Sequence, residues 1–217
     1  MNDETQILRI GIDGRWEASE FATSLTALDR LYTLRFALAM EQDDLRDLRE
    51  LYLDAPFPPF PSSMRYLRRW AKLASPTFLQ PERTPLTSAT RITAVSGLLE
   101  PGERLVVQRV IYGSPGIKDL AGVGEIVGHV KDLLVRLIDH WSTRRQRNLE
   151  NDRREPENQQ LQVEITKQFV GLAQELGYSK HEMRQLVSAA MHEQRPLVGL
   201  IASGKITSAD TVDESRP

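Results

Sequence analysis

The stretch GSPGIKDLAGVGEIVGHVKDLLVRLIDHW, residues 113–141, is the most regular part of the chain. A serine N-cap followed by proline at the first helical position is a strong helix-start signal, so a long helix is predicted from Ser114, over about 115–150. Beyond the start, apolar residues alternate between spacings of three and four, which is a heptad pattern. This seam consists of Leu120, Val123, Val127, Val130, Leu134, Leu137 and Trp141.

An apolar seam has to be covered, and this one has two possible covers. A narrow seam favours a partner helix, which predicts a homo-oligomer or a docked partner protein. The flanking Ile126, Leu133 and Ile138 widen the stripe, which suits packing inside the same chain. An interfacial membrane helix is a third alternative, but its polar face should be basic, whereas this face mixes both signs of charge.

Upstream of this stretch the pattern predicts strands and helices in alternation. Residues 7–13 alternate apolar and polar, which predicts a strand, and an amphipathic helix follows from about Glu17. Residues 32–40 alternate again, so a second strand is predicted there, with a continued helix as the alternative. A helix over 41–53 ends before the proline-rich loop at 55–61.

A hairpin is predicted next, with strands at 90–98 and 104–112 around the turn Glu100-Pro-Gly-Glu103. Downstream of the seam, helical spacing predicts helices over about 159–176 and 180–192, with Gly204 as a later stop. The polar tail at 207–217 is predicted to be disordered.

Together these elements predict an α+β fold. Residues 1–113 form its N-terminal part, a mixed sheet of about four strands with helices, in the order β-α-β followed by a hairpin. Residues 114–206 form a helical unit with one long amphipathic helix.

The composition removes several classes of function. The 217 residues carry a net charge of −2 and no cysteine, which excludes disulfides, a thiolate nucleophile and cysteine-bound metals. The four histidines fit no ligand spacing, so neither a metal nor another cofactor is expected. The acidic, polar start is unlike a signal peptide and no apolar run reaches membrane-spanning length, so the cytoplasm is the expected compartment.

One basic segment suggests nucleic-acid binding. In a helix predicted over about 62–73, four cations share one face, and such a face can bind phosphates. The alternative is a solvated surface helix. The four residues are Arg65, Arg68, Arg69 and Lys72.

Two turns could hold an anion or carry acid–base chemistry. Gly11 to Gly14 follows a strand and precedes a helix, with Asp13 as a carboxylate at the strand end. Ser114 and Gly116 stand at the predicted helix start, where free N–H groups attract anions. Neither turn matches a phosphate-loop or nucleophile motif.

The leading hypothesis is therefore a non-catalytic interaction or assembly protein that uses the 114–150 helix. Nucleic-acid binding through the basic segment is the first alternative, and an enzyme without a recognisable motif is the second.

Overall fold

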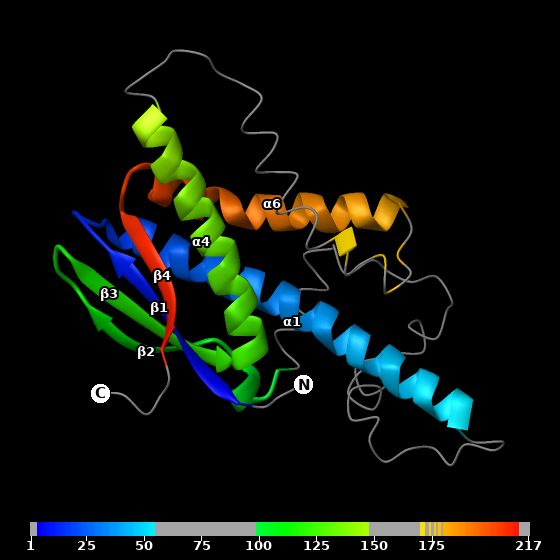
Figure 1. The fold of residues 1–217 in the computed structure, drawn as a ribbon. Coiled ribbons are helices and arrows are strands. Elements are labelled where there is room, and N and C mark those ends of the chain that lie inside the picture. The colour runs from blue at the N-terminus through cyan, green and yellow to red at the C-terminus, as the bar shows by residue number, and fades with distance from the viewer. Residues whose placement is uncertain are drawn as a thin grey trace.

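The computed structural model describes residues 4–54, 99–147 and 180–212, together with residues 170, 171, 174, 176 and 178. In these residues four strands form one sheet, with α1, α4 and α6 on one side of it (Figure 1). In chain order the elements are β1 (Thr5–Ile12), α1 (Ala18–Asp54), the short 3-10 helix η2 (Pro101–Glu103), β2 (Val106–Ile111), β3 (Gly116–Val123), α4 (Gly124–Arg147), α6 (Lys180–Ala202) and β4 (Ile206–Val212).

The strands lie in the order β2-β3-β1-β4, and each pair is antiparallel. The chain thus leaves β1, passes through α1, and enters the sheet again at β2, with β3 between the two strands. This is the split β-α-β arrangement of ferredoxin-like topologies. The predicted α+β class is confirmed. The sheet is antiparallel, however, where a mixed sheet was expected.

Helix α1 runs unbroken from Ala18 to Asp54, so the strand predicted at 32–40 is wrong and the continued helix is correct. The helix predicted at 41–53 is the last part of α1. Among residues 31–40 only Arg35 is not fully buried. A helix that is buried on all sides is apolar on all sides. Its sequence therefore has no hydrophobic periodicity by which it could be told from a buried strand.

The long helix α4 begins at Gly124 rather than at 115, because residues 116–123 form β3 in the middle of the sheet. β3 pairs with β1 on one side and with β2 on the other. Hydrogen bonds to two strands outweigh a helix-start signal in a segment whose glycines lower helix propensity. The boundary expected at 113/114 therefore falls in the turn of a β-hairpin.

The C-terminal end also differs from prediction. Residues 206–212 form β4, which pairs with β1, so the tail is not disordered over 207–212. Helix α6 continues past 192 to Ala202, with Pro196 inside it. The predicted stop at Gly204 is confirmed, since this residue has a left-handed φ of 77° just after α6.

Three predicted elements lie wholly or mostly outside the described residues. They are the strand at 90–98, the basic helix at 62–73 and the helix at 159–176, of which only a few positions are described. The second strand of the predicted hairpin is confirmed, because β2 lies within 104–112. Its described partner is β3.

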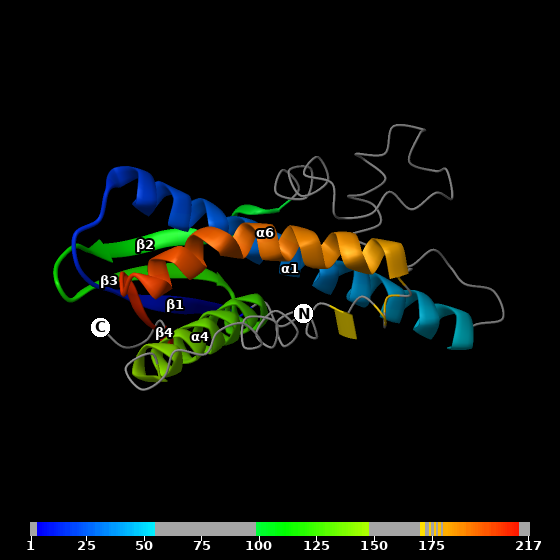
Figure 2. The ribbon, with the colours of Figure 1, turned by 90° about the horizontal axis from the view of Figure 1, so that it is seen from above.

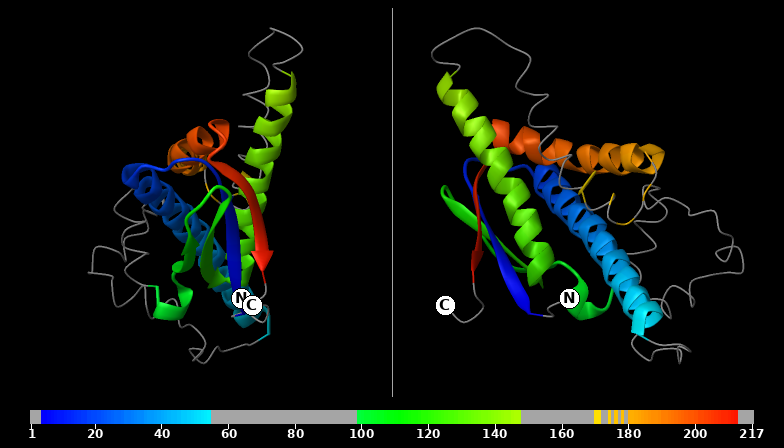
Figure 3. Two further views of the ribbon diagram at one scale, coloured as in Figure 1. Left: turned by 90° about the vertical axis from the view of Figure 1, so that its left-hand side faces the viewer. Right: turned by 45° about the vertical axis from the view of Figure 1, so that its right-hand side comes forward.

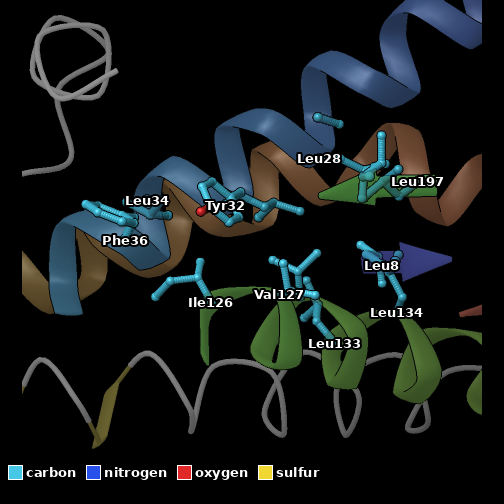
Figure 4. Packing of buried hydrophobic residues seen from close by; sticks show 14 of the residues in the cluster. Leu8, Leu28, Tyr32, Leu34, Phe36, Ile126, Val127, Leu133, Leu134 and Leu197 are labelled. Atoms are coloured by element: carbon cyan, nitrogen blue, oxygen red, sulfur yellow. The ribbon is translucent and has the colours of Figure 1, made fainter. Parts of the chain in front are cut away.

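The core lies between the sheet and the helices. Leu8 of β1, Leu28 of α1 and Leu134 of α4 point into the space between their elements (Figure 4). Viewed from above, α1 and α6 run side by side away from the sheet (Figure 2). The two views of Figure 3 show α4 lying along the strands near β4.

Tyr32 ties α1 to two other parts of the fold. Its fully buried hydroxyl donates to the carbonyl of Glu103 at 2.8 Å and accepts the N–H of Val123 at 2.9 Å. Burial raises the pKa of this phenol to about 12. The ring lies against Gly122, where an added Cβ would stand 2.8 Å from a ring carbon. A glycine in β3 therefore lets α1 approach the sheet closely.

Candidate functional site

The residues of the heptad seam lie inside the fold. Leu120 and Val123 belong to β3, and the other five belong to α4. All are buried except Trp141, which is partly buried and packs against the core. Figure 4 shows Val127 on the side of Tyr32 of α1 and Leu134 beside Leu8 of β1. The seam is therefore covered by the sheet and helices of its own chain, which is the alternative that the flanking Ile126, Leu133 and Ile138 favoured.

The two turns considered for chemistry meet in space. The hydroxyl of Ser114 donates to the carboxylate of Asp13, and the N–H of Gly14 donates to the same carboxylate oxygen at 2.7 Å. These hydrogen bonds hold the pKa of Asp13 below its usual value. A carboxylate of lowered pKa is a weak general base, so the contact serves to join the turns.

Ser114 lies in the turn of the β2–β3 hairpin and Gly116 is the first residue of β3, so neither stands at a helix start. Gly116 follows a cis Ser114–Pro115 bond. A Cβ on Gly116 would stand 2.5 Å from the carbonyl oxygen of Ile111, so the turn requires glycine here. The helix N–H groups that would have attracted an anion are absent from this position.

No group of three or more metal-ligating side chains occurs in the part of the chain that the structure describes. His129 on α4 instead accepts a hydrogen bond from Arg35 of α1, with Nη2 and Nε2 2.6 Å apart. Burial, and then the charge of Arg35, lower the pKa of His129. This histidine is therefore a neutral acceptor between two helices.

Lys118 of β3 is a buried cation that the sequence did not reveal. Its side chain points from the sheet toward α1 and is only 1% exposed. The ammonium lies 3.8 Å from the ring centre of Trp16 and 4.0 Å from that of Phe21, and it donates to Ser24 Oγ at 2.8 Å. Two aromatic faces and one hydroxyl replace the water that the charge has lost.

Stability is expected to rise with pH because of Lys118. Burial lowers the pKa of this amine to about 8, while the unfolded chain keeps the ordinary value of 10.5. The unfolded state then binds more protons between these values, so the free energy of unfolding increases with pH there. We expect a gain of about 1.5 kcal/mol between about pH 8 and 9.5 in urea unfolding.

Lys118→Met should lack this gain, and an equal pH dependence in the variant would contradict the assignment. The measurement stops at about pH 9.5 because Tyr32 acts in the opposite direction above that range: its pKa in the folded state is raised, so the unfolded phenol ionises first.

Two arginines share one carboxylate on the other face of the sheet. Asp119 of β3 is 2% exposed and lies between Arg9 of β1 and Arg109 of β2. Arg9 donates through Nε at 2.9 Å and Nη2 at 3.0 Å, and Arg109 donates through the same two atoms at 2.9 and 2.7 Å. The Arg9 guanidinium, followed by Arg109, holds the pKa of Asp119 below its usual value.

Strand β2 carries the exposed apolar surface of the described residues. Each of its six residues is exposed. β2 lies at one edge of the sheet, and no described strand pairs with its outer side. We call this surface the β2 edge. Its apolar side chains, between 41% and 62% exposed, are Val106, Val107, Val110, Ile111 and the following Tyr112.

Sequence reasoning placed β2 correctly but missed its exposure. The four valine and isoleucine side chains have the composition of a buried strand, and only the sheet order shows that the strand is at an edge. The basic residues Arg65, Arg68, Arg69 and Lys72 lie outside the described residues, so their role stays a prediction.

No protein-family model, no curated protein and no solved structure matches this chain. None of the described helices combines the length and apolarity needed to cross a membrane.

Proposed function

We propose that this chain is a non-catalytic assembly protein that associates through the β2 edge. The function class is the one that the heptad seam suggested, while the contact surface is a different one. The observation that carries the proposal is an apolar edge strand in which all six residues are exposed. Soluble proteins usually shorten, cover or charge such an edge, because its free N–H and C=O groups bind other strands.

The position of Arg109 supports this proposal. A charged side chain on an edge strand ordinarily discourages pairing. Arg109 is the charged residue within β2, and two of its nitrogens donate to Asp119 on the neighbouring inner strand. The guanidinium is thus directed inward along the sheet, and its charge is partly neutralised. The outer side of β2 keeps its apolar character.

The buried seam supports the same choice of surface. Association through Leu134 or Val127 would require α4 to leave the sheet and α1, because both side chains are fully buried in the core. Association through β2 leaves the fold unchanged. Association through the β2 edge therefore costs less free energy than association through the seam, because no part of the fold has to open.

The double variant Val107→Lys/Val110→Lys tests the proposal. Both positions are more than 40% exposed, so the fold should tolerate lysine, while two added charges on the edge should prevent strand pairing. We expect sedimentation velocity to show an oligomer for the unchanged protein and a monomer for the variant, with the same circular dichroism spectrum.

Thr207→Lys is the matched control. It adds one lysine at an exposed position of β4, the opposite edge strand of the described sheet, and should leave the mass unchanged. An oligomer that persists in the double variant, or that Thr207→Lys dissociates, would rule out the β2 edge as the contact.

A further inference from the structure

We infer that the occupant of the β2 edge is the β2 edge of a second copy, paired antiparallel about a twofold axis perpendicular to the sheet. This inference rests on the proposed function and adds the partner and the register. The sequence Val106-Val-Gln-Arg-Val-Ile111 reads apolar, apolar, polar, polar, apolar, apolar in either direction. A strand with this symmetry can match its own reversed copy.

In the matching register Val106 faces Ile111 of the second copy, and Val107 faces Val110. The sheet geometry agrees with these pairs. Val106 and Ile111 oppose Ala121 and Ile117, on the face that carries Asp119. Val107 and Val110 instead oppose Leu120 and Lys118, on the face toward the helices. Side chains that meet in this register therefore lie on the same face of a continuous sheet.

Val106 and Ile111 point to the same face of the sheet because β2 contains an irregularity. The register with β3 shifts between Val107 and Arg109, so Gln108 is an extra residue in the strand. In a strand without a bulge, two positions five apart in sequence, such as Val106 and Ile111, point to opposite faces. The bulge at Gln108 instead gives Val106 and Ile111 the same orientation, as a twofold axis through the centre requires.

Charge selects this register over its neighbours. In the matching register Gln108 faces Arg109 of the second copy, so no two like charges are directly opposite. A shift of one residue in one direction sets Arg109 opposite Arg109, which is unfavourable. A shift in the other direction sets Arg109 opposite Val107 and brings side chains from different faces together.

Cysteine cross-linking tests the register, since the chain has no cysteine of its own to give a background. Val106→Cys and Ile111→Cys are prepared separately, mixed, allowed to exchange subunits and oxidised. In the inferred register the two new thiols face each other at a Cα separation of about 5 Å, within the range of a disulfide. We expect a covalent dimer on a non-reducing gel of the mixture.

Each single variant alone is the control. Two copies of Cys at 106 would be five residues apart along the paired strands, about 17 Å, which is too far for a disulfide. A mixture without the covalent dimer, or an equal yield from one variant alone, overturns the register. If Val107→Lys/Val110→Lys still dissociates the oligomer in that case, the proposed function stands and only this inference fails.

Discussion

Leu134→Asp is expected to unfold the protein and not to separate folded subunits. Leu134 is fully buried where α4 meets β1 and α1, so a carboxylate there would lose its water without gaining a partner. Truncation to alanine at such a site already costs about 2–5 kcal/mol, and a buried charge costs more. A domain of this size has only about 5–15 kcal/mol of stability to lose.

Circular dichroism and urea unfolding measure the effect. Thr143→Asp is the matched control, because it places the same carboxylate at an exposed position of α4, nine residues further along. We expect Thr143→Asp to unfold within about 0.5 kcal/mol of the unchanged protein. A folded, monomeric Leu134→Asp protein would show that the seam serves association and that the packing described above is wrong.

Asp119→Asn is expected to have two effects at once. The amide keeps the shape of the side chain but cannot neutralise two guanidiniums, and hydrogen bonds to charged groups are worth about 1.5–3 kcal/mol. Because Arg9 and Arg109 are partly exposed and can be solvated again, we expect a loss of about 2 kcal/mol. Arg109 is then also free to turn outward, so association through the β2 edge should weaken.

The two effects are measured separately. Urea unfolding at a fixed protein concentration gives the stability, and sedimentation at native conditions gives the association. The pKa of Asp119 is lowered in the folded state, so its stabilising contribution is lost as pH falls through that value. The variant should lack this loss. Asp139→Asn, at an exposed position of α4, should change neither quantity. Unchanged association in Asp119→Asn would mean that the direction of Arg109 does not matter for the edge.

The sequence predicts the class of the fold better than its elements. The alternation of residues 7–13 gives β1 correctly, because one face of that strand is buried and the other carries Arg9. The strand predicted at 32–40 is wrong because a helix that is buried on all sides has no hydrophobic periodicity. The helix predicted over residues 116–123 is wrong because Leu120 and Val123 are three apart and so fit a helical stripe. Only the pairing of this segment with two strands makes it β3.

The candidate surface depends on information that a single sequence does not contain. Lys118 and Asp119 are adjacent charges that resemble the polar face of a helix. As neighbours in a strand they point to opposite faces, where one meets Trp16 and the other meets Arg9. The exposure of β2 likewise follows from the strand order β2-β3-β1-β4, which local patterns do not determine.

The mass of the unchanged protein over a range of concentrations tests the central claim most directly. Sedimentation equilibrium should give a mass that rises with concentration toward twice the 24.6 kDa of one chain, as edge-to-edge pairing of two copies requires. A mass that stays at 24.6 kDa at every concentration would contradict assembly through the β2 edge.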